Sequence, residues 1–384
     1  MAHYFIFPEK DTTLYSHPDR KGLNAGRDEI LEIVKEKGST DAYHYPTRIL
    51  LKFDNADIKT AIEKIGSSTF NDGTTNTYLQ LNAMQAKNLV TSFNLQSYPI
   101  SGSWDEGTGK YLNIPTGSNG GSWLYRDNSI DKTYWPTGSF SDGTTGSVSS
   151  SIVTEGGGAW YTGSGFVATQ QFLIGDDLNT NLDVTSIIQK WSASFYASQT
   201  YPDGIDNNGF IIMEPKSVEA NTSGSSGELQ YFSVDTHTIY PPKLNFKWDD
   251  SSYGASGGSI KTSGDLNVVL YNLKKEYNQN EEAYLRIQVR DRYPTRTFVT
   301  SSNFLDTGYF KSTSYYSIRD GHTEEEIIPF DNTFTKLSSD SDGMYFKLDM
   351  KGLQPERYYR ILLKHINNDG TTTYDNKYIF KVIR

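Results

Sequence analysis

Alternating or continuous runs of apolar positions recur along most of this chain, and they predict a protein built mainly from short β-strands. The clearest runs in the first half cover residues 48–54, 78–84, 89–95 and 166–174. Successive side chains of a strand point to opposite faces, so such runs place at least one face of each strand on a core. Turn-forming Gly, Asn, Asp and Ser residues separate the runs, as in antiparallel sheets joined by loops.

Two segments show helical spacing instead. Residues 55–65 and 183–191 repeat apolar side chains every three or four positions, which predicts two short amphipathic helices. We expect Asn55 or Asp57 to cap the start of the first helix, because short polar side chains are favoured there. Residues 28–37 fit both a short helix and a strand, since their apolar positions agree with either period, so both structures stay open for them.

A Gly- and Ser-rich stretch separates these elements from a second β-rich region. Residues 251–264 read SSYGASGGSIKTSG, which is typical of a linker. Beyond it, residues 265–277 and 283–293 alternate cleanly, and residues 278–280 predict a hairpin-like turn between two strands. The second region therefore begins with a strand pair.

The last forty residues predict three more strands. Their strongest turn signal is Asn-Asp-Gly at residues 368–370, and the final strand covers residues 378–382. The expected fold class is therefore mostly β. We expect a jelly-roll-like β-sandwich over residues 1–250 and an immunoglobulin-like β-sandwich over residues 265–384.

The composition excludes several classes of protein. Aromatic residues make up 14% of the chain although the mean hydropathy is −0.58, so this is not a disordered profile. The net charge is −10 and no Lys/Arg run exceeds two residues, which argues against nucleic-acid binding. The chain has no cysteine, no apolar run of transmembrane length and no visible signal peptide. We therefore expect synthesis in the cytoplasm and no insertion into a membrane.

Residues 97–165, which we call the insert, differ in character from the rest of the sequence. Gly, Ser, Thr and Asp are crowded there, and long loops of this kind are usually functional or form interfaces. The insert carries these aromatic residues: Trp104, Trp123, Tyr125, Tyr134, Trp135, Trp160 and Tyr161. The rings either form a platform for sugars or pin the loops and fill an interface. Trp191 and Trp248, by contrast, occupy inward positions and are expected in the core.

Little in the sequence indicates catalysis or metal binding. Four acidic pairs, such as Asp105 with Glu106, would suit a structural calcium ion, but none has EF-hand spacing; no other cofactor is expected. Glu106, Glu155 and Asp183 lack the arrangement that a two-carboxylate glycosidase needs. The six histidines form neither H-x-H nor H-E-x-x-H, which argues against zinc. We therefore expect no enzymatic activity.

Five short segments follow one another in an informative order. They are DTTLYSH with the turn Leu23–Gly26, RILLKFD at Arg48–Asp54, WDEG at Trp104–Gly107, DVT at Asp183–Thr185 with Trp191, and NGF at Asn208–Phe210. Together they resemble a DNRLRE-type module, a β-sandwich similar in shape to carbohydrate-binding modules, over roughly two-thirds of the chain. The insert is larger and richer in Gly and Ser than that family pattern.

The pairing of such a module with an immunoglobulin- or fibronectin-like domain resembles a virion structural protein of a contractile-tailed marine phage. The resemblance implies a component of the tail, baseplate or neck, assembled in the host cytoplasm. Its expected partners are other virion proteins and symmetric copies of itself, with the C-terminal strand and the insert as contact surfaces. The alternative is a module that recognises a host-surface glycan.

Overall fold

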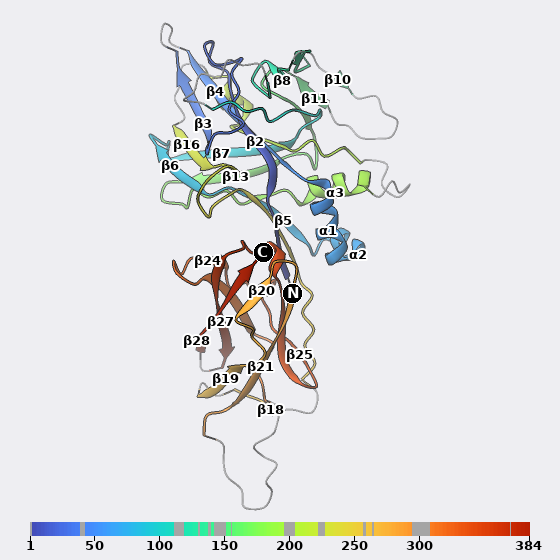
Figure 1. Cartoon of the computed structure of the whole chain (residues 1–384), viewed down its shortest axis with the longest axis vertical. Helices are drawn as coiled ribbons and strands as arrows, with labels where there is room; N and C mark the ends of the chain where they lie inside the picture. Colours follow the sequence, from blue (N-terminus) through green and yellow to red (C-terminus); the bar gives the residue numbers. More distant parts are fainter. Residues whose placement is uncertain are drawn as a thin grey trace, which may run out of the picture. The chain divides into compact units, whose positions relative to one another are not determined.

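The computed structural model describes most of the chain and divides it into two compact units. Described are residues 2–38, 43–110, 119–129, 131–136, 140–141, 151–154, 156–195, 204–221, 227–255, 259–262, 265–293, 308–368 and 370–384. The larger unit is Ile6–Asn245, and the smaller unit joins Met1–Phe5 to Phe246–Arg384. Strands hold 47% of the residues and helices 10%, which confirms the mostly β, sandwich-like fold class (Figure 1).

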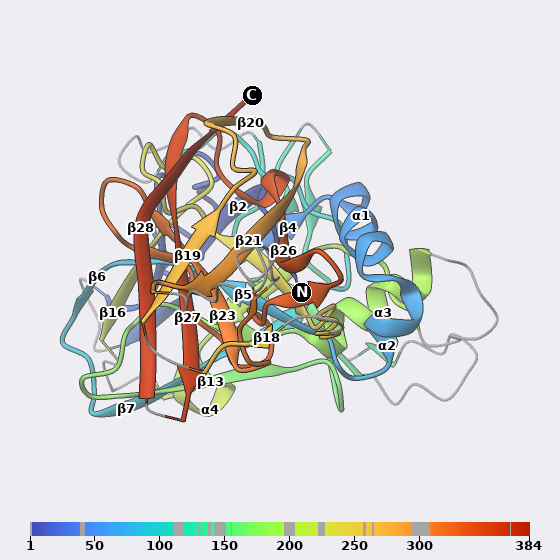
Figure 2. The same cartoon turned by 90° about the horizontal axis from the view of Figure 1, so that it is seen from below.

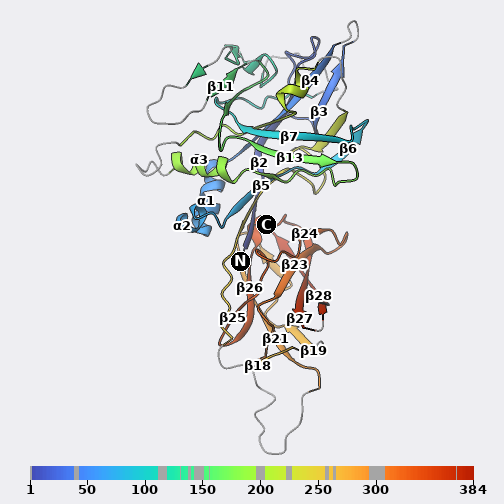
Figure 3. The ribbon, with the colours of Figure 1, turned by 180° about the vertical axis from the view of Figure 1, so that it is seen from behind.

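The main sheet of the larger unit has eight strands. In spatial order these are β13 (Ala168–Leu173), β7 (Ser92–Pro99), β15 (Phe210–Met213), β4 (His44–Phe53), β3 (Ile30–Lys37), β16 (Glu228–Phe232) and β6 (Ala83–Lys87), with β2 (Pro8–Tyr15) also paired to β4. Figure 3 shows β7 and β13 side by side at one edge of this sheet. The pairings within it are antiparallel, as the short turn-bounded runs predict.

Three smaller sheets complete the strands of this part of the chain. The first is β1 (Ala2–Ile6), β17 (Lys243–Trp248), β5 (Asn76–Gln80) and β14 (Leu182–Asp183). The other two lie in the insert: β10 (Phe140–Ser141), β11 (Ser151–Thr154) and β12 (Ala159–Thr162), and β8 (Tyr125–Asp127) with β9 (Thr133–Tyr134). Strands β1 and β17 each pass from one unit into the other.

The ambiguous segment at residues 28–37 is a strand. Within β3, Leu31, Ile33 and Lys35 are buried while the residues between them are partly exposed. This period of two follows from pairing, because β16 lies antiparallel to β3 and sets Leu229 opposite Ile33. Pairing with β16 therefore selects the strand over the helix, which the local sequence permits equally.

Both predicted helices are present, but the first has a different cap. Helix α1 (Asn55–Ile65) begins after Asp54, whose Oδ1 accepts a hydrogen bond from the Ala56 N–H at 3.0 Å. The prediction of Asn55 or Asp57 as cap was wrong, because Asp54 has the extended backbone from which a side chain can fold back over the first turn. The short helices α2 (Ser67–Asn71) and α4 (Lys216–Glu219) were not predicted.

Helix α3 (Thr185–Phe195) starts two residues later than predicted. The Asp183 carboxylate accepts hydrogen bonds from both the N–H and the hydroxyl of Thr185, at 3.1 and 2.6 Å. Trp191 is fully buried, with its ring 4.6 Å from that of Phe210 in the main sheet. The placement of Trp191 in the core is confirmed, and so is that of Trp248, which is 7% exposed.

The smaller unit is a sandwich of two sheets. One contains β18 (Ser259–Ile260), β22 (Gly308–Tyr309), β21 (Glu282–Asp291), β26 (Gly343–Asp349), β25 (Ser338–Asp340) and β19 (Leu266–Leu270). The other contains β20 (Glu276–Asn278), β28 (Gly370–Ile383), β27 (Arg357–Asn367), β23 (Ser314–Asp320) and β24 (Glu326–Ile328). A 3-10 turn, Met350–Gly352, follows β26. The segment predicted as a linker, residues 251–264, includes β18.

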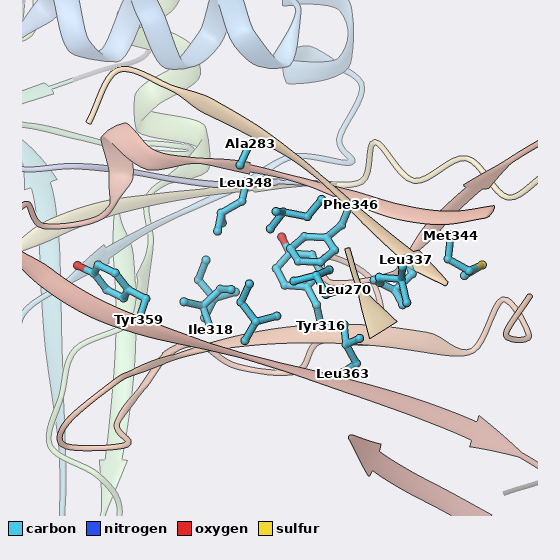
Figure 4. Close-up of a cluster of buried hydrophobic side chains, with 14 of the residues drawn as sticks. Leu270, Ala283, Tyr316, Ile318, Leu337, Met344, Phe346, Leu348, Tyr359 and Leu363 are labelled. Carbon is cyan, nitrogen blue, oxygen red and sulfur yellow. The ribbon is translucent and has the colours of Figure 1, made fainter. Parts of the chain in front are cut away.

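Side chains from both sheets form one core, shown in Figure 4. Tyr316 of β23 and Phe346 of β26 stack across the sandwich with ring centres 4.3 Å apart. Phe5, from the other end of the sequence, belongs to the same buried cluster and is 3% exposed. It lies so close to Gly352 that a Cβ at that glycine would be 2.9 Å from the Phe5 nitrogen.

Both predicted strand pairs of the smaller unit are present, but only one of them has the predicted turn. Strands β27 and β28 form the hairpin expected at residues 368–370, with Asn367 opposite Gly370; Asp369 lies outside the described residues (Figure 2). The strand pair expected from residues 265–277 and 283–293 is present, because β19 lies antiparallel to β21 with Leu270 opposite Ile287. The tight turn expected at residues 278–280 does not join them directly: the connection contains β20, which pairs in parallel with the end of β28.

Candidate functional site

The insert is anchored to the larger unit by its tryptophans. Trp104, Trp135 and Trp160 are 4%, 2% and 1% exposed and share one buried cluster with main-sheet residues such as Leu50 and Ile211. Two of the indole nitrogens also donate hydrogen bonds: Trp104 Nε1 to the Asn208 carbonyl at 2.9 Å and Trp135 Nε1 to the Ser122 carbonyl at 2.7 Å. These three rings therefore present no open face on which a sugar could stack.

Arg48 of β4 organises the base of the insert. Its Nε and Nη2 donate to the two Glu219 oxygens at 3.0 and 2.8 Å, and both side chains are buried. Its Nη1 donates to the carbonyls of Gly156 and Gly157, each at 2.9 Å. The planar guanidinium has several N–H donors in a fixed geometry, so it connects strand β4 to helix α4 and to the loop at Gly156 and Gly157.

Two indoles enclose the same guanidinium. The carbon Cζ of Arg48 lies 4.5 Å from the Trp123 ring centre and 4.9 Å from that of Trp160. Gly157, at φ +65°, packs against Trp123 so closely that a Cβ there would meet the ring at 2.6 Å. Trp123 is half-buried between Arg48 and this glycine, so it too serves the anchoring of the insert.

The residues that carry the DNRLRE-like resemblance form internal joints. Asn24 donates from Nδ2 to the carbonyls of Glu106 and Gly121 at 2.7 and 2.8 Å, and its Oδ1 accepts from the N–H groups of Gly26 and Gly109 at 3.1 and 2.8 Å. A Cβ at Gly26 would lie 1.9 Å from the Glu106 carbonyl oxygen. The opening turn and the WDEG segment therefore fit only with Asn and Gly at these two positions.

Asn207, directly before the NGF segment, forms a joint of the same kind with Gly209 of that segment. Asn207 donates to the Phe53 carbonyl at 2.9 Å and to Asn55 Oδ1 at 2.7 Å, and its own Oδ1 accepts from the Gly209 N–H at 3.0 Å. Gly209 has φ +97°, and a Cβ there would lie 2.2 Å from the Leu51 carbonyl oxygen. The motif thus connects β15 to the end of β4 and the start of α1.

A group of carboxyl groups lies beside the Asn24 joint. Asp11 is fully buried, and burial raises the pKa of its carboxyl well above the ordinary value, helped by the charges of Glu106 and Asp235. Burial also raises the pKa of Glu106, although Arg27 opposes this. Arg27 forms ion pairs with both acids: its Nη2 lies 3.0 Å from Glu106 Oε2, and its Nη1 lies 3.2 Å from Asp235 Oδ1. Two carboxyl groups with raised pKa values are a feature that the spacing of the sequence did not indicate.

Among the aromatic residues of the insert, Tyr125 and Tyr134 form an exposed pair. Their ring centres lie 4.6 Å apart on the β8–β9 hairpin, the hydroxyl oxygens are 3.4 Å apart, and Tyr134 is 59% exposed. The Lys132 ammonium lies 5.4 Å from the Tyr125 ring centre. Tyr161, in contrast, is 9% exposed and stacks on Phe166.

A second exposed aromatic group, which the sequence reasoning missed, lies on the solvent face of the smaller unit. Its members, the tyrosine–arginine cluster, are Tyr271, Tyr284, Arg286, Asp340 and Tyr345. Tyr284 and Tyr345 stack at 4.6 Å, and Arg286 lies 4.8 and 5.2 Å from their ring centres. Asp340 accepts from both Arg286 Nη atoms at 2.6 and 2.8 Å. Tyr271 lies beside Arg286, with its N–H donating to the Arg286 carbonyl at 3.3 Å, and is 55% exposed.

The signal for this cluster is present in the sequence of β21. Its alternation buries Leu285 and Ile287 and turns Tyr284 and Arg286 to solvent. The cross-strand pairing then sets Tyr345 opposite Arg286. Sequence alone does not reveal that partner strand, which is why the cluster escaped notice.

The carboxylates that were weighed above for catalysis, and not predicted as a site, have other contacts in the described residues. Asp183 caps α3, Glu106 pairs with Arg27, and Glu155 lies outside the described residues. No group of three His, Asp or Glu side chains able to hold a metal ion occurs in the parts of the chain that the structure describes. Across those same parts, the helices are all too short or too polar to span a bilayer.

Comparison with known proteins gives distant matches only. No protein-family model and no curated protein matches this chain. The β-glucuronidase of Parabacteroides merdae aligns with 80% of this chain and 28% of its own, at 10% identity and a TM-score of 0.18. β-Glucuronidase 3 of Bacteroides uniformis aligns with 96% of this chain and 29% of its own, at 8% identity and a TM-score of 0.17. The adhesin domain of Epf from Streptococcus pyogenes aligns with 99% of this chain and 91% of its own, at 8% identity and a TM-score of 0.16.

This chain thus spans less than a third of each glucuronidase. The three TM-scores are too low to indicate a shared fold or function. The DNRLRE-like resemblance stays a prediction.

Proposed function

We propose that this chain is a structural component of a phage virion, in the tail, baseplate or neck, and that it acts through protein–protein contacts. The observation that carries the proposal is the tyrosine–arginine cluster. Tyr and Arg dominate the residues that contribute most to protein interfaces, and rigid rings lose little conformational entropy on binding. The stack of Tyr284 on Tyr345 and the fork of Arg286 on Asp340 hold this group in place before a partner arrives.

The distribution of charge favours the smaller unit as the contact surface. Ile6–Asn245 contains 27 acidic and 17 basic residues, whereas the remainder of the chain contains 19 of each. The whole net charge of −10 therefore belongs to the larger unit. Copies of a neutral surface approach one another without the mutual repulsion that acidic surfaces impose.

The burial of the predicted aromatic residues supports a structural role over a catalytic one. Trp104, Trp135 and Trp160 fasten the insert to the main sheet, and Arg48 and Glu219 fix its base. A well-anchored insert suits a protein that holds its shape within an assembly. The virion itself, its symmetry and its partner chains enter this proposal from the resemblance of the sequence.

Substitution of Tyr271 tests the proposal directly. Tyr271→Ala should reduce incorporation of the protein into particles, because it removes an exposed ring of the cluster. Incorporation is measured by quantitative blotting of purified virions. Tyr43→Ala is the matched control, since Tyr43 is also 55% exposed but lies in the larger unit. Equal incorporation of both variants, with melting temperatures unchanged, would contradict a contact role for the cluster.

The exposed pair Tyr125 and Tyr134 favours a second candidate, recognition of a host-surface glycan. An exposed ring can stack on sugar C–H groups while neighbouring polar groups bind hydroxyls. Binding of the isolated protein to host polysaccharide, lost in Tyr134→Ala and kept in Tyr271→Ala, would favour this function. Absence of any binding would leave the structural role.

A further inference from the structure

Asp11 connects three segments that are far apart in the sequence of the larger unit. Asp11 lies on β2, Glu106 belongs to the WDEG segment of the insert, and Val234 lies in the turn after β16. The Asp11 N–H donates to Glu106 Oε1 at 3.4 Å. Asp11 Oδ2 accepts from the Val234 N–H at 2.6 Å. The main chain of Asp11 thus bonds to the insert and its carboxyl group bonds to the turn, so a charge on that carboxyl would lie close to the Glu106 carboxylate.

The Asp11 carboxyl is poorly suited to carry a charge where it lies. It is fully buried, and its Oδ1 forms no hydrogen bond with any residue that the structure describes. An ionised carboxylate away from water needs several donors, and among the described residues the Asp11 carboxyl has one, the Val234 N–H. A protonated carboxyl group needs fewer contacts and carries no charge.

The charged groups that face Asp11 strengthen this preference. Burial is the largest influence and opposes a negative charge on it, as do the charges of Glu106 and Asp235. The Val234 N–H and the Arg27 cation favour the charge but are outweighed. Arg27 is already bound to Glu106 and Asp235, and its side chain is 47% exposed, so solvent weakens its effect. Lys10, the other nearby cation, donates to a main-chain carbonyl of the insert.

We propose that Asp11 is a proton-dependent latch, and that the protonated carboxyl keeps β2, the WDEG segment and the turn at Val234 together. Loss of the proton places a buried negative charge beside Glu106 and Asp235 and loosens the two segments. The sign follows from linkage: a folded-state pKa above the ordinary Asp value makes the closed form most stable in acid. That stability declines as the pH rises from the ordinary Asp value to the folded-state one.

Carbon-detected NMR of the Asp11 carboxyl in the full chain tests the proton itself. We expect the carboxyl to titrate well above the ordinary pKa of Asp, because of its burial. Ionisation of Asp11 at or below that ordinary value would overturn the proposal. This measurement uses the natural sequence, so it does not depend on the folding of a variant.

Hydrogen exchange of the Val234 amide then tests the latch. The exchange rates are first corrected for the intrinsic pH dependence of amide exchange. The equilibrium constant for local opening at Val234 should then rise by up to about tenfold per pH unit, over the pH range in which Asp11 is protonated in the closed form and ionised in the open form. Asp11→Asn should remove this contribution. Asp235→Asn is the matched control: it removes a more exposed carboxylate of the same group, and it should keep the dependence over a narrower pH range, because burial is the largest cause of the raised Asp11 pKa. Equal pH dependence in the natural protein and in Asp11→Asn would overturn the latch.

Discussion

At the scale of single residues, the polar and aromatic groups that suggest a binding site in the sequence mostly hold the protein together. The short motifs were recognisable from the sequence, but their function as joints was not. Asn24 alone bonds to main-chain groups of Glu106, Gly109 and Gly121, which lie more than eighty positions away. The burial of Trp135 and Trp160 was equally beyond the sequence, since aromatic residues in a Gly-rich stretch fit both an exposed platform and an anchor.

The buried pair of Arg48 and Glu219 gives a prediction at this scale. Arg48→Met should lower the free energy of unfolding of the larger unit by about 3–5 kcal/mol, because Glu219 keeps a buried charge without its main partner. Urea denaturation measures this. Arg20→Met, at a partly exposed ion pair with Glu36, should cost less than about 1 kcal/mol. A double variant, Arg48→Met with Glu219→Leu, should regain part of the loss, and a further loss instead would contradict the argument.

At the scale of elements, the sequence predicted those structures whose signal is local. The helix at residues 55–65, the strands at 48–54 and 166–174 and the hairpin of β27 and β28 are present, because periodicity and turn residues specify them. Pairing between distant strands was not predictable in this way. The turn expected at residues 278–280 differs for that reason: β19 and β21 pair as predicted, but β20 between them pairs with β28, about a hundred residues further along the chain.

The cap of α1 gives the prediction at the element scale. Asp54→Ala should destabilise the larger unit by about 1 kcal/mol, because the Ala56 N–H loses its side-chain acceptor. Asp54→Asn should be nearly neutral, since asparagine offers an equivalent oxygen. Thermal unfolding followed by circular dichroism compares the two. If both variants lost the same stability, the charge of Asp54 rather than its capping bond would be what stabilises the helix.

At the scale of the whole molecule, the observed division into two units lies close to the boundary that the sequence suggests near residue 250, and it differs mainly at the N-terminus. The sequence suggests one domain over residues 1–250, because composition changes only at the Gly- and Ser-rich stretch near residue 251. Contacts instead assign residues 1–5 and 246–250 to the smaller unit. Composition cannot reveal this, since an apolar N-terminal strand suits either core. Only the position of Phe5 among the smaller unit's buried side chains decides the matter.

Phe5 therefore offers the test of the division. Phe5→Ala should cost about 3–5 kcal/mol, because it leaves a cavity in a core made otherwise of residues beyond position 265. Hydrogen exchange should show the loss of protection in β21 and β26 of the smaller unit, with β7 and β15 of the larger unit unchanged. Phe5→Leu, which keeps most of the apolar volume, should show a smaller loss in the same strands. Loss of protection centred on β7 and β15 would instead place Phe5 in the domain of residues 1–250 that the sequence suggests.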